Sequence, residues 1–308
     1  MYKHLLKMAD LTKEDIFEIF ELAEKLKNYN KNKIEHPLLK NKTLGMIFTK
    51  ASTRTRVSFE VGMTQLGGKA IFLSQSELQL GRGESIYDTA KVLSRYVEGI
   101  MIRTFEQKDA EDLAKYGSIP VINGLTDYAH PCQVLADLMT VKEYKFKEGK
   151  TFENLKLCFV GDGFNMANSL LVGGLTVGMN VSIANPKGYE ISREMKNFGE
   201  KFKNRFTFTN DAKEAAKEAD VLVTDAWCSM GQSGEENRKE AFKDYKIDSD
   251  LMKNAKKDAM VLHCLPAYKD QEISSEVFAE HENEIFDEAE NRLHAQKAVM
   301  VKLMGQNI

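Results

Sequence analysis

A run of small polar and basic residues follows the first strongly apolar segment of the chain. It comprises Ser52, Thr53, Arg54, Thr55 and Arg56. Ser52 is placed to cap a helix over residues 54–66, so backbone N–H groups, hydroxyls and a guanidinium would converge on one point. Such a point binds anions, and phosphate fits it best. Alternate residues lie about 200° apart around a helix, so only one arginine can face a ligand, and we assign Arg54. The same pattern also fits a capped surface helix with solvated arginines.

Two further polar clusters follow later apolar segments of the first half. Arg103 comes directly after a strand predicted over residues 99–102, although most such arginines are surface residues. His130, Pro131, Cys132 and Gln133 follow a strand over residues 119–122. Pro131 is suited to the first turn of a helix over residues 131–144. His130 and Gln133 are three residues apart, so both can reach one ligand and donate to a developing carbonyl oxyanion.

The second half contains three candidate sites at strand ends. Asp225 ends a strand over residues 221–224, where an acid could hold an ammonium group or simply cap a turn. Cys264 follows His263 after a strand over residues 260–262, as an inert or a polarised thiol. A glycine-rich turn precedes Asn165, but Met166 replaces the third glycine of the dinucleotide fingerprint and the next strand ends in Asn185 rather than an acid. The spacing therefore disfavours a dinucleotide and leaves Asn165 as a ligand contact.

Alternating strands and helices must position these clusters. In the first half, strands are predicted over 43–49, 70–73, 99–102 and 119–122; in the second, over 155–160, 181–184, 206–209, 221–224 and 260–262. Helical patterns between them imply an α/β fold with two largely parallel sheets flanked by helices. The basic stretch at 142–150 marks a boundary between domains at 1–147 and 148–308, and a last helix spans about 288–303. Ligands bind outside the carboxyl ends of such strands, where the clusters lie.

Composition excludes several other classes of protein. The chain has 308 residues and a net charge of −3, from 43 basic and 46 acidic side chains, which argues against a nucleic-acid binder. No segment approaches the ~20 apolar residues of a membrane span, and the N-terminus lacks a secretory signal. The four cysteines are far apart, which argues against a zinc cluster or a disulfide framework. We therefore expect a cytoplasmic protein.

Taken in order, these clusters resemble the transcarbamoylase family. The runs at 52–56 and 130–133 are similar to its carbamoyl-phosphate signatures. The runs at 225–231 (DAWCSMG) and 263–266 (HCLP) are similar to the branch that acts on ornithine, whereas the aspartate branch carries HPLPR at the second position. The resemblance covers essentially the whole chain. It implies transfer of the carbamoyl group of carbamoyl phosphate to the δ-amine of L-ornithine, which gives L-citrulline and phosphate.

The resemblance also implies site residues, by motif position. Carbamoyl phosphate would bind Ser52, Thr53, Arg54, Thr55, Gln79, Arg103, His130, Pro131, Cys132, Gln133, Cys264, Leu265 and Arg292. The catalytic groups among them would be Arg54, Arg103, His130, Gln133 and Cys264. Ornithine would bind Asn165, Asp225, Ser229 and Met230. The family implies no cofactor, no metal, and a homotrimer with active sites at subunit interfaces. The last helix would return to the first domain.

Three other interpretations remain open at this point. Another family member could act on aspartate, putrescine or N-acetylornithine, although Asp225 and the loop at 229–231 supply an acid and a loop for an α-amino acid. A catalytically silent binding subunit is disfavoured because every motif position is occupied. A nicotinamide enzyme is disfavoured by Met166 and Asn185.

Overall fold

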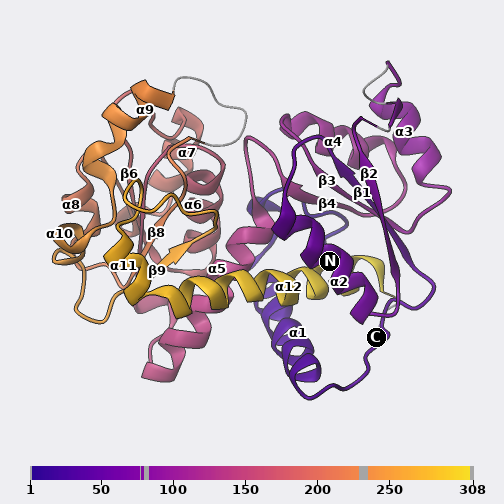
Figure 1. The fold of residues 1–308 in the computed structure, drawn as a ribbon, viewed down its shortest axis with the longest axis horizontal. Coiled ribbons are helices and arrows are strands. Elements are labelled where there is room, and N and C mark those ends of the chain that lie inside the picture. Colours follow the sequence, from indigo (N-terminus) through magenta and orange to yellow (C-terminus); the bar gives the residue numbers. More distant parts are fainter. Residues whose placement is uncertain (1, 77, 80–82, 229–234, 306–308) are drawn as a thin grey trace. The chain divides into compact units, whose positions relative to one another are not determined.

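The chain folds into two compact α/β units, shown in Figure 1 in a computed structural model that describes residues 2–76, 78–79, 83–228 and 235–305. The first unit comprises residues 1–136 and 291–308, and the second comprises residues 137–290. The chain passes from one unit to the other inside a helix each time, whereas the sequence placed the change after residue 147. The expected fold class, two largely parallel sheets flanked by helices, is confirmed.

The first unit has a parallel sheet with strand order β2-β1-β3-β4 in the described part of the chain. Its elements are α1 (Lys13–Lys31), β1 (Thr43–Phe48), α2 (Thr53–Gln65), β2 (Lys69–Ser74), α3 (Ile86–Leu93), β3 (Gly99–Arg103), α4 (Gln107–Tyr116), β4 (Val121–Leu125) and the start of α5 (Pro131–Lys145). β1, β3 and β4 are almost wholly buried, and their apolar runs suit a parallel sheet covered on both faces. β2 lies at one edge of the sheet, and none of its residues is fully buried.

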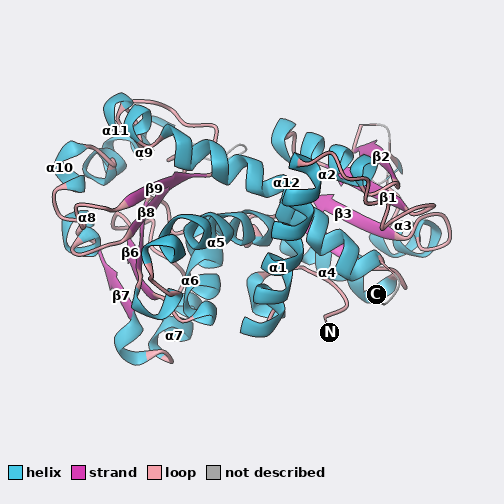
Figure 2. Cartoon of the chain, turned by 90° about the horizontal axis from the view of Figure 1, so that it is seen from below, coloured by secondary structure: helices cyan, strands magenta, loops and turns pink. Residues whose placement is uncertain are grey.

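The second unit has a parallel sheet with strand order β7-β6-β5-β8-β9 in the described residues. Its elements are β5 (Lys156–Val160), α6 (Asn165–Val177), β6 (Asn180–Ala184), α7 (Arg193–Glu200), β7 (Phe206–Thr209), α8 (Ala212–Ala216), β8 (Val221–Thr224), α9 (Glu235–Phe242), α10 (Ser249–Met252), β9 (Met260–His263), α11 (Ser275–Glu280) and α12 (Glu282–Met304). Figure 2 shows helices on both faces of this sheet. The sheet order makes β5, β8 and β9 neighbours, so their carboxyl ends meet at one edge.

α12 is longer than the sequence suggested. It begins at Glu282 rather than near residue 288, directly after His281 ends α11. Residues 291–305 belong to the first unit, as expected of a last helix that returns to the first domain. Within the described residues, no helix combines the length and the apolar character needed to cross a membrane.

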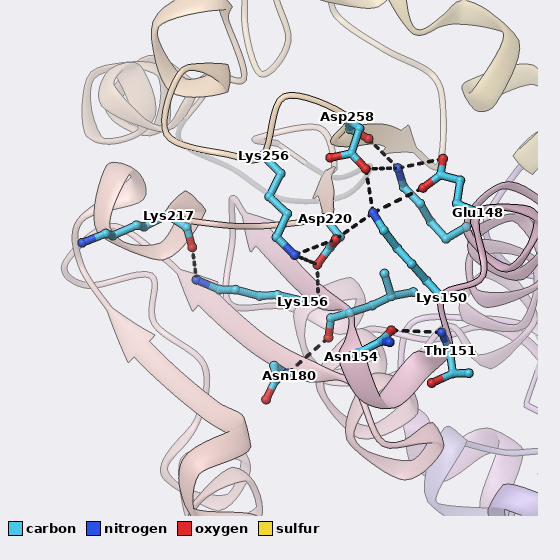
Figure 3. A network of polar contacts seen from close by, with 12 residues as sticks. Glu148, Lys150, Thr151, Asn154, Lys156, Asn180, Lys217, Asp220, Lys256 and Asp258 are labelled. Carbon is cyan, nitrogen blue, oxygen red and sulfur yellow. Dashed lines mark hydrogen bonds and ion pairs between the residues drawn. The ribbon is translucent and has the colours of Figure 1, made fainter.

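A buried acid, Asp220, connects several segments at the amino-terminal ends of β5 and β8 (Figure 3). Asp220, which is fully buried, accepts from the backbone N–H of Lys156 at 2.9 Å and from Lys256 Nζ at 2.9 Å. Lys150 Nζ lies 3.3 Å from Asp220 and 2.6 Å from Asp258. The hydrogen bond from Lys150 lowers the pKa of Asp258 to about 2. These contacts join the starts of β5 and β8 to the segment before β9. The candidate residues Asp225 and Cys264 lie at the carboxyl ends of β8 and β9 instead.

Candidate active site

The candidate site of the first unit includes the N-terminal tip of α2. The Ser52 side chain accepts from the Thr55 backbone N–H at 3.2 Å, so the predicted cap is confirmed. Thr53 is exposed, Arg54 is half-buried and Thr55 is buried. Arg56 lies on the outer face, where Nε donates to Glu60 at 3.0 Å and the guanidinium stacks on Phe72. Of the two arginines, Arg54 is therefore the one suited to a ligand at the helix tip.

Two more arginines converge on the hydroxyl of Thr55. Arg103 is the last residue of the buried strand β3, and its Nη1 lies 3.4 Å from Thr55 Oγ1. Arg292 comes from α12, and its Nη2 lies 3.3 Å from the same oxygen. Arg292 Nη1 also donates to Gln133 Oε1 at 2.7 Å. The structure thus brings Thr55, Arg103, Gln133 and Arg292 together, although they are up to 237 residues apart in the chain.

His130 is a buried, neutral imidazole in this cationic cluster. Burial lowers its pKa well below the ordinary value, and the charges of Arg292, Arg103, Arg54 and Lys50 lower it further, in that order. A neutral imidazole can donate one hydrogen bond and carry no charge, which suits a group that polarises a carbonyl. Lys50, which the sequence did not single out, is itself buried and lies 3.4 Å from Asp127.

The two residues that follow His130 lie at the start of α5. Pro131 is the first residue of α5, as predicted. Cys132 is buried, its Sγ lies 3.4 Å from the Asn123 carbonyl oxygen, and burial raises its pKa to about 12. Its thiol therefore stays protonated and points into the core. Gln79 stands apart: it is exposed after β2, and among the described residues no contact joins its side chain to the cluster.

The second unit has a candidate site of its own, which pairs an acid with a thiol. Asp225 follows β8 and Cys264 follows β9, and Cys264 Sγ donates to Asp225 Oδ1 at 2.9 Å. Burial raises the pKa of Cys264 well above its ordinary value, and the Asp225 carboxylate raises it further. Cys264 is therefore a neutral donor rather than a thiolate. Asn165, the first residue of α6, is buried after β5, the strand beside β8. Ser229 and Met230 lie outside the described residues.

A buried histidine and glutamate shape the backbone after Cys264. Leu265 has a φ of 55°, a left-handed conformation that costs a branched residue about 1–2 kcal/mol. Its N–H donates to His263 Nδ1 at 2.9 Å, so the ring proton is on Nε2, which donates to Glu272 Oε1 at 3.0 Å. His263 and Glu272 are both buried. Sequence analysis assigns no role to His263 and does not single out Glu272, because nothing in their spacing marks a contact between them.

The glycine-rich turn after β5 is filled by the protein itself. The Gly163 N–H donates to the Tyr189 carbonyl oxygen at 2.8 Å. A Cβ on Gly163 would lie 2.2 Å from the backbone of Glu190 and Ile191. The dinucleotide fingerprint needs this glycine to let a pyrophosphate approach the backbone. Here the backbone of Glu190 and Ile191 occupies the space that a pyrophosphate would need. This supports the interpretation that the turn positions Asn165 rather than a dinucleotide.

Comparison with known proteins agrees with this geometry over the whole chain. Residues 3–143 match the carbamoyl-phosphate-binding domain of the aspartate/ornithine carbamoyltransferases, and residues 153–303 match their aspartate/ornithine-binding domain. Two parallel α/β units, one with an arginine-rich helix tip and one with an acid–thiol pair, define a carbamoyl-group transferase. The chain belongs to the aspartate/ornithine carbamoyltransferase family.

Its relatives narrow the class further. The chain is 52% identical, over 97% of each sequence, to an ornithine carbamoyltransferase of Caldicellulosiruptor saccharolyticus. It is 50% identical to one of Archaeoglobus fulgidus, over 99% of this chain and 98% of that one. Among solved structures, the ornithine carbamoyltransferase of Pyrococcus furiosus has a TM-score of 0.92 at 47% identity, covering 99% of this chain and 98% of that one. The anabolic enzyme of Campylobacter jejuni has 0.90 at 42%, covering 98% of each.

Proposed function

We propose that this enzyme transfers the carbamoyl group of carbamoyl phosphate to the δ-amine of L-ornithine, giving L-citrulline and phosphate. The main support is the full-length similarity, at about half of all positions, to relatives named for this reaction. The pairing of Asp225 with Cys264 adds to it, because a carboxylate at this strand edge suits the α-ammonium of an amino acid. Putrescine has no α-carboxylate, and the α-amine of N-acetylornithine is uncharged.

We propose that the phosphate sits on the tip of α2. The backbone N–H groups after Ser52 and the Arg54 guanidinium would bind it, since a helix N-terminus carries partial positive charge. Arg103 and Arg292 would add charge from β3 and α12. These cations would stabilise the phosphate as it departs. Thr53 and Cys132 would contribute through backbone N–H groups, and Pro131, which has no N–H, would contribute by starting α5 beside them.

The carbonyl oxygen of the carbamoyl group would lie near His130, Gln133 and Thr55. Gln133 Oε1 accepts a hydrogen bond from Arg292, so the amide N–H₂ of Gln133 is the group that can donate to a substrate oxygen. As the amine attacks, negative charge grows on that oxygen, and each well-aimed donor lowers the barrier by ~3–4 kcal/mol. His130 can act as such a donor because it is neutral.

Ornithine would bind the second unit, through Asn165, Asp225 and the loop that contains Ser229 and Met230. The backbone at Cys264 and Leu265 would meet the δ-amine. That amine resembles a lysine amine, whose free pKa is ~10.4, and must be neutral to attack. Turnover at low ornithine should therefore rise with pH through neutrality, and a flat profile of kcat/KM for ornithine would contradict this step.

An amine panel tests the substrate assignment. Purified enzyme is incubated with carbamoyl phosphate and, separately, L-ornithine, L-aspartate, putrescine or N-acetylornithine, and both carbamoylated product and phosphate are measured. We expect L-ornithine to give the highest kcat/KM of the panel and to exceed N-acetylornithine by at least about 100-fold, because losing the ion pair to Asp225 costs about 3 kcal/mol. A better rate with any other amine would overturn the assignment.

We also propose a homotrimer whose sites are shared between subunits. Val57, Val61 and Ile71 expose 50%, 38% and 47% of their surface on the outer face of α2 and on the edge strand β2. A neighbouring copy that covers this face would explain these apolar side chains and would bring its own Gln79 to the site.

Mixing two inactive variants tests this arrangement. Co-expressed Arg54→Ala and Gln79→Ala chains should recover about a quarter of wild-type activity, since a site that takes one residue from each of two adjacent subunits is intact by chance in about one case in four. Light scattering should give three times the chain mass. A monomer, or no recovery in the mixture, would contradict the shared site.

We place the enzyme in the cytoplasm, in arginine biosynthesis. Cys264 can donate to Asp225 only as a reduced thiol, which suits a reducing compartment. The similarity to a structure titled as an anabolic enzyme favours synthesis over breakdown. Rescue of growth without arginine in a bacterium that lacks this activity, together with faster citrulline formation than phosphorolysis, would support this role.

A further inference from the structure

A buried glutamine bridges two of the groups assigned to phosphate. Gln296 lies one turn after Arg292 on α12 and is fully buried. Arg292 Nε donates to Gln296 Oε1 at 2.9 Å, and Gln296 Nε2 donates to Ser58 Oγ at 2.7 Å. Ser58 Oγ in turn donates to the Arg54 carbonyl oxygen at 2.7 Å. One carboxamide thus connects the Arg292 side chain to the backbone of Arg54.

The direction of each hydrogen bond in this chain is fixed. An arginine Nε can only donate, so the atom of Gln296 that faces it must be the oxygen. The Ser58 hydroxyl has one proton, and the two carbonyl oxygens within its reach, those of Arg54 at 2.7 Å and Thr55 at 3.2 Å, both belong to its own helix. Ser58 Oγ must therefore accept from Gln296. Both ends require the same amide orientation, so the network is complete in one arrangement only.

We propose that Gln296 is a positioning residue for the carbamoyl-phosphate site, an inference that rests on the function proposed above. Holding Nε fixes the plane of the Arg292 guanidinium, so that Nη1 and Nη2 point to Gln133 and Thr55. The same amide steers the Ser58 hydroxyl onto the carbonyl of Arg54. Without Gln296, the Arg292 guanidinium can rotate about its last side-chain bonds, and the buried Nε of Arg292 loses its acceptor.

Packing between the two helices does not depend on this bridge. A Cβ on Gly62 of α2 would lie 2.9 Å from Met300 Cε and 3.2 Å from Lys297 Cγ, so the helices approach closely one turn further along. Lys297, the next residue, is also fully buried, and its Nζ donates to Gln65 Oε1 at 2.8 Å, at the far end of α2. Lys297→Met is therefore a matched control, which removes a buried polar contact between the same helices away from Arg292 and Ser58.

Kinetics with a double-mutant cycle test the proposal. Gln296→Met keeps the length of the side chain and removes both hydrogen bonds, so we expect KM for carbamoyl phosphate and Kd for inorganic phosphate to rise about tenfold. KM for ornithine at saturating carbamoyl phosphate should change less than twofold. Ser58→Ala, at a half-buried position that tolerates alanine, should shift the same constants in the same direction. In the double variant, the fold increase in each of these two constants should be smaller than the product of the increases in the single variants.

Two further variants, Lys297→Met and Arg292→Lys, distinguish failure of this proposal from failure of the site assignment. Lys297→Met should alter thermal stability and leave both phosphate constants unchanged. If Gln296→Met leaves them within twofold of wild type, or if it and Lys297→Met shift them equally, Gln296 does not position the site. If Arg292→Lys also leaves them unchanged, the site assignment itself fails. If only Arg292→Lys shifts them, the assignment stands and the role of Gln296 is refuted.

Discussion

Replacing Arg292 by lysine keeps the positive charge and removes the shape of the group. The guanidinium reaches three acceptors at once: Gln296 Oε1 at 2.9 Å, Gln133 Oε1 at 2.7 Å and Thr55 Oγ1 at 3.3 Å. These acceptors lie on α12, α5 and α2. A lysine ammonium is a single point on a flexible stem and cannot replace a planar fork aimed in several directions.

The expected loss follows from the number of donations. A hydrogen bond that involves a charged group contributes about 1.5–3 kcal/mol, and an ammonium can restore at most one of the three. Losing two lowers the stabilisation of bound phosphate and of the aligned Gln133 by about 3–6 kcal/mol. That corresponds to a fall of about 100- to 10,000-fold in kcat/KM for carbamoyl phosphate.

Citrulline formation at varied carbamoyl phosphate and saturating ornithine measures this loss, with circular dichroism to confirm the fold. A value for Arg292→Lys within about threefold of wild type, or under ~0.7 kcal/mol, would refute the reasoning. Arg292→Met separates charge from shape. Burial is the largest cause of the low pKa of His130 and Arg292 is the next, so Arg292→Met should raise that pKa. Activity of the methionine variant should then fall more steeply than that of the lysine variant on the acid side of neutrality.

Three further changes test separate parts of the structure. Arg54→Ala should leave the fold intact and retain less than about a tenth of kcat/KM, a loss above ~1.4 kcal/mol; a more active variant would show that another group binds the phosphate. Asp225→Asn should raise KM for ornithine at least about tenfold, and should lower the pKa of Cys264 so that iodoacetamide alkylates the thiol faster at a given pH. Burial lowers the pKa of Lys297 to about 8, against 10.5 in the unfolded chain. Between these two pH values the unfolded chain binds more protons than the folded chain, so the free energy of unfolding increases as the pH rises. The free energy of unfolding of wild type, minus that of Lys297→Met, should therefore increase by about 2–3 kcal/mol between pH 7 and pH 10 in urea titrations, and a constant difference would contradict this.

The strands of both sheets were predictable because buried parallel strands are short, continuous apolar runs. Every predicted strand is present, with ends that differ by at most a few residues. The largest shift is in β4, expected at 119–122 and found at 121–125. Pro120 has no N–H to give to a ladder, so the strand begins after it, and Asn123 and Gly124 continue it in spite of their low strand preference.

Helix ends were less predictable where capping competes with periodicity. The apolar pattern suggested a helix over residues 84–97, but α3 runs only from Ile86 to Leu93. The Ser85 side chain caps it by accepting from the Asp88 N–H at 3.1 Å, and residues 94–96 form a turn instead. At α12 the reverse occurred: no glycine or proline separates it from α11, so nothing in the composition marks its start at Glu282.

The positions of the site residues were predictable from strand ends, and their partners were not. Any polar residue after a parallel strand is a candidate, which sufficed for Arg103, Asp225 and Cys264. The approach of Arg292 to Thr55 depends on how a helix near the end of the chain packs, and no local pattern encodes that. Gln296 and Glu272 escaped notice for the same reason, since each is recognisable only from the side chain it holds.

The two units create opposite electrostatic environments with the same device, the burial of a group that must stay neutral. In the first unit, four cations and burial keep His130 uncharged, so the local field favours a dianion and leaves the imidazole as a donor. In the second, burial and Asp225 keep Cys264 protonated, so the local field favours a cation. A strand edge next to a carboxylate holds an ammonium firmly but does nothing to deprotonate a second amine. In the function proposed above, the Asp225–Cys264 pair therefore holds the α-ammonium and is not the group that removes the δ-amine proton.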